Sequence, residues 1–282
     1  MILIADSGST KTDWRLIDEN KQIHQYATQG ISPYFQTSEE IAAMLVKELL
    51  SQINIPLVNL TINYYGTGCG NDEKKEVVAA ALKHNFKNAI VNVESDMLAA
   101  ARSLCGNEKG IAAILGTGSN TCFYDGKIIV ANTPSVGYLL GDEGSGAHIG
   151  KTFIQAFLNN ELPEGIKNNF TARQNISQAV ILDNVYKKPY PNRYLASFSK
   201  FVFQNIKEQY LADLVINCFQ QFFEKHICKY PNHKEIPFNC VGSVAFYYSK
   251  ILQHVAETNN VSLGKIIESP IAALSLYYLE EL

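Results

Sequence analysis

One pattern, an apolar strand followed by a turn of small polar residues and a second strand, occurs twice in this sequence. The first copy has strands expected over 2–5 and 13–17 around a turn at 6–10, and the second has strands over 111–115 and 121–124 around a turn at 116–120. In each copy a further segment, 22–26 or 127–130, can return antiparallel. The repeat predicts two similarly built domains facing each other, with a chance pairing of two hairpins as the alternative.

Between the two copies the chain alternates between strand and helix patterns. Thr37 and Glu40 form a capping-box signature before a helix whose apolar residues share one face. Further strands are predicted over 60–65 and 89–93, and helices over 72–84 and 96–104. This alternation predicts an α/β fold in which helices cover the sheet.

The second half of the chain is richer in helical patterns. Helices are predicted over 147–159, 176–186, 193–205 and about 211–230, then a strand over 236–241, a helix to about 257 and a last helix from Ser269-Pro270, with loops at 168–175 and 187–192. The predicted domains are 1–110 and 111–268, and the C-terminal helix 269–282 is a candidate to complete the first.

Composition excludes several classes of protein. Apolar residues make up 46% and charged residues 18%, which predicts an ordered core. The formal net charge of −3 argues against nucleic-acid or membrane-surface partners that depend on bulk positive charge. The sequence contains no run of about 20 apolar residues, the length that a membrane span needs. The first apolar run is too short for a signal peptide. Six cysteines without a C-x-x-C pair predict reduced thiols in a cytoplasmic protein.

The turn after the first strand is a candidate phosphate-binding loop. Gly8 and Ser9 leave room for backbone N–H groups to turn toward an anion. Thr10 and Lys11 could add a hydroxyl and a positive charge, and Asp6 could hold Mg²⁺, usually through water. An ordinary tight hairpin is the alternative.

The corresponding turn in the second copy has the same chemistry. Gly116, Thr117 and Gly118 are small, so two loops in equivalent places could bind a polyphosphate from both sides. Gly242-Ser243 lies between a strand and a helix, where a nucleotide can approach the backbone, although a plain helix cap explains it nearly as well.

Acidic residues mark two further candidate positions. Asp96 follows a strand and could accept the proton of a hydroxyl that attacks a γ-phosphate, although a first-turn acid also favours the positive end of its helix. Gly141, Asp142 and Glu143 belong to a segment with four glycines in ten residues, 137–146. That segment predicts a loop that closes on a polar ligand, with a solvated surface loop as the alternative.

The three loops at 6–12, 116–120 and 141–146 together resemble the signatures of the N-acetylglucosamine kinase and BadF/BadG-type ATPase family, in the actin, hexokinase and chaperone-ATPase superfamily. The resemblance covers essentially the whole chain, and 241–243 is similar to the family's adenosine-side motif. It implies two ribonuclease-H-like domains with mixed five-stranded sheets flanked by helices, and a cleft between them that closes on ATP and substrate.

The resemblance also implies roles for individual residues. Asp6 and 9–11 match the first phosphate loop, and Thr117 and Gly118 match the second, with ATP and Mg²⁺ as cofactors. Asp96 matches the general base. Asn120 and Asp142 match residues that bind amino-sugar hydroxyls, and Ser32 lies near a sugar contact that is Asn in some relatives.

The activity implied is transfer of the γ-phosphoryl group to a hydroxyl, expected to be the 6-OH, of N-acetylglucosamine or a related sugar such as N-acetylmuramic acid. A homodimer is expected by analogy. One alternative is an ATPase activator of an acyl-CoA dehydratase or reductase with an iron–sulfur cluster, although the spacing of Cys105 and Cys122 does not resemble its ligand pattern. The other is a sugar or nucleotide sensor without activity on the same fold.

Overall fold

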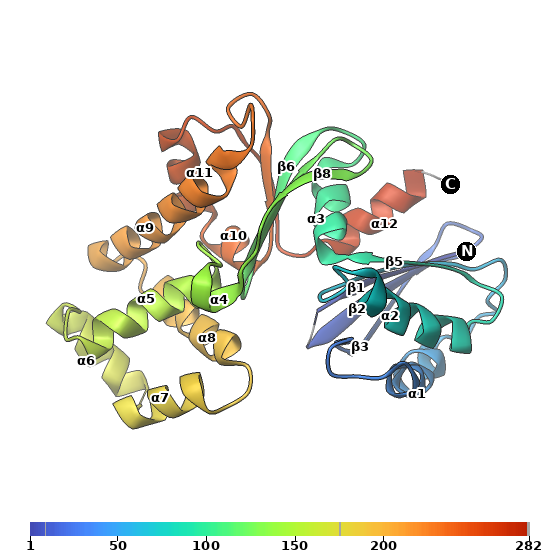
Figure 1. Cartoon of the computed structure of the whole chain (residues 1–282), viewed down its shortest axis with the longest axis horizontal. Coiled ribbons are helices and arrows are strands. Elements are labelled where there is room, and N and C mark those ends of the chain that lie inside the picture. The colour runs from blue at the N-terminus through green and yellow to red at the C-terminus, as the bar shows by residue number, and fades with distance from the viewer. Residues whose placement is uncertain (9, 175, 281–282) are drawn as a thin grey trace. The chain divides into compact units, whose positions relative to one another are not determined.

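The computed structural model describes residues 1–8, 10–174 and 176–280, and the chain divides into two compact units. Unit 1 comprises Met1–Asn107 and Ser269–Leu282, and unit 2 comprises Glu108–Glu268. Each unit is built on one five-stranded sheet with helices packed against it (Figure 1).

The sheet of unit 1 combines an antiparallel hairpin series with parallel strands. Its strands are β1 (Ile2–Ser7), β2 (Lys11–Ile17), β3 (Ile23–Gln29), β4 (Thr61–Gly66) and β5 (Ile90–Ser95). They lie in the order β3-β2-β1-β4-β5; β1, β2 and β3 pair antiparallel, and β1, β4 and β5 pair parallel. The mixed pairing follows from the connections: tight turns join the first three strands, whereas helical crossovers precede β4 and β5.

The sheet of unit 2 has the same topology. Its strands are β6 (Gly110–Leu115), β7 (Ser119–Tyr124), β8 (Ile129–Thr133), β9 (Phe238–Val241) and β10 (Leu263–Ile267). Their order is β10-β9-β6-β7-β8, with β6 in the place that β1 takes in unit 1. The two strand–turn–strand segments read from the sequence are therefore equivalent elements, which confirms the predicted fold class of two mixed five-stranded sheets.

Alternating side chains on the sheet of unit 1 bury both of its faces. Its helices are α1 (Ser38–Glu48), the 3₁₀ turn η1 (Leu50–Gln52), α2 (Asp72–Asn85), α3 (Asp96–Cys105) and α12 (Ile271–Glu280). Leu3 and Ala5 belong to the core beneath α1 and α2, whereas Ile4 packs with α3 and α12 on the other face (Figure 1). The predicted capping box of α1 is present, with Thr37 and Glu40 each accepting a backbone hydrogen bond from the other residue.

Unit 2 carries a larger helical layer. Its helices are α4 (Gly137–Leu140), α5 (Gly146–Leu158), α6 (Glu164–Arg173), α7 (Gln178–Tyr186), α8 (Pro191–Gln204), α9 (Gln209–Lys225), the 3₁₀ turn η2 (Ile227–Lys229), α10 (Ser243–Tyr247) and α11 (Ser249–Thr258). Helix α5 packs along α8, and an apolar core joins them to β6 and α9. No helix within the described parts of the chain combines the length and the apolar character that crossing a bilayer requires.

Three local predictions are wrong. The loop predicted over 168–175 is helical as far as Arg173, because Ile166 and Phe170, one turn apart, both bury against the core. The single helix predicted after Ser243 is broken at Tyr248 into α10 and α11. Strand β10 was not expected, since its middle residues are exposed and it shows no regular alternation.

Phe170 is the central ring of the unit 2 core. It is fully buried, and it makes edge-to-face contacts with Phe153, Phe157, Phe198 and Phe201 at centroid distances of 4.9–6.0 Å. We expect Phe170→Ala to lower the free energy of unfolding by about 3–5 kcal/mol, through lost burial and the cavity left behind.

Urea denaturation followed by circular dichroism measures this loss. The matched control is Phe35→Ala, because the Phe35 side chain is 77% exposed and its removal should change stability by no more than about 0.5 kcal/mol. Equal losses in the two variants would contradict the central role of Phe170.

Candidate functional site

Two carboxylates of unit 1 lie side by side at one end of its sheet. Asp6 is the next-to-last residue of β1, and the register places it directly opposite Asp13 on β2. Asp96, the first residue of α3, follows β5, whose carboxyl end lies at the same edge as that of β1 because the two strands run in the same direction. Burial, and then repulsion from Asp13 and Asp96, raise the pKa of Asp6 to about 7. The end of the sheet therefore concentrates negative charge that a cation would relieve.

Asp96 is held in one position by the start of its helix. Thr67, in the turn after β4, donates from Oγ1 to Asp96 Oδ2 at 2.9 Å, and the Met97 backbone N–H also donates to the carboxylate. Ser95 caps the helix by accepting from the Leu98 N–H. Burial nevertheless raises the pKa of Asp96, because desolvation disfavours the carboxylate. A fixed carboxylate with a raised pKa is a stronger base than an ordinary aspartate, which suits it to accept a proton.

The first candidate phosphate loop lies beside these acids. The Gly8 N–H donates to the Lys11 carbonyl at 3.0 Å, which closes the turn between β1 and β2. Thr10 is exposed, and the Lys11 ammonium pairs with Asp13 at 2.7 Å. Ser9, predicted for the same loop, lies outside the described residues. The structure thus joins the cation of this loop to the carboxylates at the end of the sheet.

Ser32 lies in a turn next to the loop that carries Thr67. Its carbonyl accepts from the N–H groups of Phe35 and Gln36, and its own N–H donates to Gln36 Oε1 at 2.7 Å. The adjacent Tyr34 ring packs against Gly68, where an added Cβ would lie 3.2 Å from the ring. The proximity agrees with a substrate-side position for Ser32, whose sugar contact stays a prediction.

In unit 2 three glycine-containing segments meet at the end of β6. The carbonyls of Gly116 and Thr117 accept from the N–H groups of Gly146 and Ala147 at 2.8 and 3.0 Å, so the second candidate phosphate loop is joined to the start of α5. Gly242 adopts a φ of +125°, and an added Cβ would lie 2.3 Å from the Leu115 carbonyl oxygen. Only glycine allows this approach, which brings Ser243 next to the same loop.

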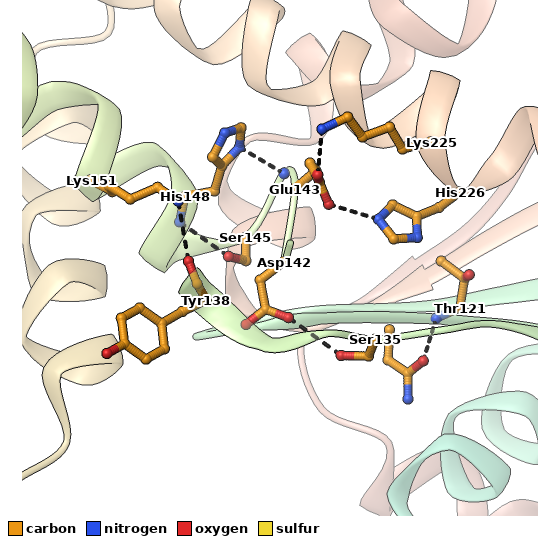
Figure 2. Close-up of polar contacts among 12 residues, drawn as sticks. Thr121, Ser135, Tyr138, Asp142, Glu143, Ser145, His148, Lys151, Lys225 and His226 are labelled. Atoms are coloured by element: carbon orange, nitrogen blue, oxygen red, sulfur yellow. Dashed lines mark hydrogen bonds and ion pairs between the residues drawn. The ribbon is translucent and has the colours of Figure 1, made fainter. Parts of the chain in front are cut away.

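Asp142 packs against this loop. It is 7% exposed, it accepts from the Ser119 backbone N–H, and Ser135 Oγ lies 3.4 Å from its Oδ1 (Figure 2). A Cβ on Gly118 would lie 2.8 Å from Asp142 Oδ2, so glycine makes room for the carboxylate. Burial raises the pKa of Asp142.

The glycine-rich segment is exposed at its start and buried after it. Leu139 and Leu140, at the end of the short helix α4, are exposed, whereas every residue from 141 to 150 is buried, so the alternative of solvated acids is wrong for Asp142 and Glu143. Asn120, the other predicted sugar contact, uses its Oδ1 to accept from the Thr121 N–H at 2.9 Å and from Asn132 Nδ2 at 3.2 Å. Both of these bonds use Oδ1, so Nδ2 is the group of Asn120 through which a ligand contact would be made.

Glu143 anchors the segment to the end of α9. Its two oxygens pair with Lys225 Nζ at 2.7 Å and with His226 Nε2 at 3.0 Å, and the residue is 6% exposed (Figure 2). Burial raises the pKa of Glu143, but the hydrogen bonds from Lys225 and His226 outweigh it and lower the pKa to about 2. Both oxygens are therefore engaged by the protein, and the predicted contact of Glu143 with a sugar stays a prediction.

His148 supports the same segment from α5. Its Nδ1 accepts from the Gly144 N–H at 3.1 Å, and Ser145 caps α5 by accepting from the His148 N–H (Figure 2). Burial lowers the pKa of His148 to about 4, which keeps the imidazole neutral and able to accept this bond. Lys225 and His226 were not predicted, because they lie more than eighty positions away from Glu143, which they contact. His148 was not predicted either, although it lies only four positions after Gly144.

A cavity of about 620 Å³ opens beside the glycine segments of unit 2. It is lined by the predicted Gly116, Thr117 and Ser243 together with residues of α8 and α10. Its size is within the range of small-molecule sites, and its mixture of aromatic and basic side chains fits a nucleoside with phosphates.

The lining residues that were not predicted include Arg193, Lys200 and Tyr247. Arg193 and Lys200 are seven positions apart on α8, a spacing that puts both on one helix face. That spacing was visible in the sequence, but nothing local indicated that this face borders the loop at 116–118.

The described side chains do not form a site that would bind a metal ion directly. Across residues 1–8, 10–174 and 176–280, no group of three or more His, Cys, Asp or Glu side chains is placed to hold a metal ion. Asp6 still fits a hydrated cation, since it lies near two other carboxylates, Asp13 and Asp96, and Mg²⁺ usually keeps several waters.

Comparison with known proteins gives consistent results. The sequence profile of the BadF/BadG/BcrA/BcrD ATPase family matches residues 5–272. A solved structure from Porphyromonas gingivalis, provisionally assigned as an N-acetylglucosamine kinase, is 40% identical and superposes with a TM-score of 0.91 over 99% of both chains. A comparison with curated protein sequences gave no match.

More distant structures share the fold alone. A provisionally assigned N-acetylglucosamine kinase from Chromobacterium violaceum is 17% identical, with a TM-score of 0.73 over 98% of both chains. MreB 5 of Spiroplasma citri, solved with AMPPNP, is 11% identical, with a TM-score of 0.53 over 99% of this chain and 95% of that one.

The anchor at Glu143 predicts a pH-dependent difference in stability. Because its folded pKa lies below the ordinary value, the ion pairs stabilise the fold above about pH 5 and are lost as the pH falls toward about 2. We expect Glu143→Gln to lower the free energy of unfolding by about 2–3 kcal/mol at neutral pH. The variant and the wild type should have the same free energy of unfolding at about pH 2.

Thermal denaturation of both proteins across this pH range provides the measurement. Glu224→Gln, at an exposed position on α9, is the matched control and should differ from wild type by a small, pH-independent amount. A constant offset for Glu143→Gln as well would show that the carboxylate is not anchored as described.

Proposed function

Because the chain belongs to the BadF/BadG/BcrA/BcrD ATPase family, we propose that it is an ATP-dependent sugar kinase acting on an N-acetylated amino sugar. N-acetylglucosamine and relatives such as N-acetylmuramic acid are the expected acceptors, with the 6-OH as the expected hydroxyl. Identity of 40% over 99% of both chains with the Porphyromonas gingivalis protein supports this substrate class.

The single observation that carries the proposal is the position of Asp96. Its carboxylate is fixed by Thr67 and by the N-terminus of α3, and it stands beside a second acid, Asp6, whose pKa is raised to about 7. A carboxylate that is oriented and partly desolvated can accept the proton of an attacking hydroxyl. A purely structural first-turn acid would need neither feature.

Asp6 and Lys11 of unit 1 would help to neutralise the negative charge of the phosphates. Asp6 would hold Mg²⁺ through water, and Mg²⁺, when bound, supplies neutralisation of charge on the phosphates. The Lys11 ammonium is paired with Asp13 at 2.7 Å. If it turned from Asp13 to a phosphate oxygen, it would add a positive charge there.

In unit 2 the cavity beside the glycine segments would hold the nucleotide. Backbone N–H groups of the loop at 116–118 would face phosphate oxygens, and the aromatic residues of the cavity would contact the base. Asp142 and Asn120 would bind sugar hydroxyls, and Glu143 would keep Asp142 in place through the anchored backbone. We expect the active protein to be a cytoplasmic homodimer.

A coupled assay of ADP release tests the activity. The panel comprises N-acetylglucosamine, N-acetylmuramic acid, N-acetylmannosamine, glucosamine and glucose, and phosphorus NMR of the product identifies the phosphorylated hydroxyl. Turnover confined to the N-acetylated sugars would support the proposal, whereas tight ligand binding without turnover on any of the five would favour a sensor.

The role of Asp96 predicts a specific kinetic defect. We expect Asp96→Asn to fold normally and to lower kcat by about 10²–10⁴, because the amide cannot take the hydroxyl proton. The matched control is Asp72→Asn, a first-turn acid of α2 that is exposed and should retain turnover. Near wild-type kcat in Asp96→Asn would remove the residue from this role.

The role of Asp142 predicts a defect in one ligand. We expect Asp142→Ala to weaken sugar binding by about tenfold or more and to leave ATP binding within a few-fold of wild type, as loss of hydrogen bonds to one ligand requires. Calorimetric titration with each ligand separately measures both affinities. Asp213→Ala, exposed on α9, is the control, and equal losses for sugar and ATP would refute the assignment.

A further inference from the structure

A second cavity, in unit 1, is not used by the proposed reaction. It has a volume of about 350 Å³ and lies between the sheet and the helices α3 and α12. Arg102 lines it from α3, six residues after Asp96 and therefore about 9 Å farther along the helix axis.

Strand register makes this part of the sheet face polar. Asn63 on β4 lies opposite Asn92 on β5, and Tyr65 lies opposite Glu94, so all four side chains project on the same face. Helix-covered sheet faces are usually apolar, and buried polar groups cost free energy unless they are hydrogen-bonded. Asn92 Nδ2 donates to Asn63 Oδ1 at 3.0 Å, which satisfies part of this need. Asn63 is only 7% exposed, and it also lines the cavity.

The guanidinium of Arg102 is enclosed by phenols. Its Nη1 donates to the hydroxyls of Tyr65 and Tyr278 at 2.5 and 3.2 Å, and its centre lies 5.8 and 5.7 Å from the ring centroids of Tyr65 and Tyr277. Its Nε–H is buried and has no hydrogen-bond partner among the described residues. Neutral phenols satisfy part of the guanidinium but do not balance its charge.

The acid that lines the same cavity is already paired. Glu94 forms an ion pair with Lys75 at 2.6 Å. Arg102 has no carboxylate partner within the described ranges, so the residues described there leave its positive charge uncompensated. A partly buried cation without a counter-ion is unfavourable, and an incoming anion would relieve this cost.

We propose that this cavity binds a small organic anion, a carboxylate or a phosphate monoester, through the guanidinium of Arg102. Guanidinium pairs with both anions through two parallel hydrogen bonds, and the amides of Asn63 and Asn92 offer further donors at the cavity wall. The volume is at the small end of ligand sites, which restricts the ligand to a few heavy atoms beyond the anionic group.

Arginine side-chain NMR can test this site directly. The chain contains four arginines, Arg15, Arg102, Arg173 and Arg193, so the Nε–H signal of Arg102 is identified by its loss in Arg102→Lys. Malonate and inorganic phosphate are titrated separately into the wild-type protein. We expect a saturable shift of the Arg102 signal with a Kd of about 1 mM or tighter for at least one of the two, as a charge-assisted pair predicts.

Glu94→Gln gives a second test that does not depend on how well an Arg102 variant folds. It removes from the cavity wall a negative charge that would repel the anion, and it leaves Arg102 in place. The affinity for the anion should therefore rise about twofold to fivefold. A shift in wild type that tightens in Glu94→Gln supports the proposal. Absence of a saturable shift of the Arg102 signal with either anion overturns it, as does a shift whose affinity is unchanged in Glu94→Gln.

Discussion

The parallel pairing of β1, β4 and β5 decides where the chemistry of unit 1 can occur. Because these strands run in one direction, the residues at or just after their carboxyl ends, Asp6, Thr67 and Asp96, reach the same edge of the sheet. Burial, and then repulsion from Asp13 and Asp96, raise the pKa of Asp6 at this edge, and the hydrogen bond from Thr67 fixes the orientation of Asp96. An antiparallel β4 would send Thr67 to the opposite edge, and the hydrogen bond that orients Asp96 would not exist.

Local signals in the sequence were sufficient for much of the fold. Helices α1, α2 and α3 begin where Thr37, Asn71 and Ser95 accept backbone hydrogen bonds, and such caps depend only on neighbouring residues. Helix α6 lacks a capping side chain at Pro163 and was missed. Its stability comes from contacts of Phe170 with distant rings, which a single sequence does not reveal.

The candidate site divides in the same way. Glycine turns at the ends of strands could be recognised because their composition is unusual over a few residues. The partners of Glu143 could not be recognised, since Lys225 and His226 lie at the end of a distant helix. Nothing in the sequence around them distinguishes this Lys-His pair from another such pair on the surface. Asp142 thus depends on a long-range anchor for its position, although its own motif is short.

The raised pKa of Asp6 has a consequence for how unit 1 handles protons. Near neutral pH this carboxyl is about half protonated in the folded chain but ionised once unfolded, so folding takes up protons, and the native state loses stability at this position as the pH rises from about 4 to about 7. Any divalent ion that settles there must expel the proton first. Its affinity would then climb with pH, and each binding event would acidify the surrounding solvent.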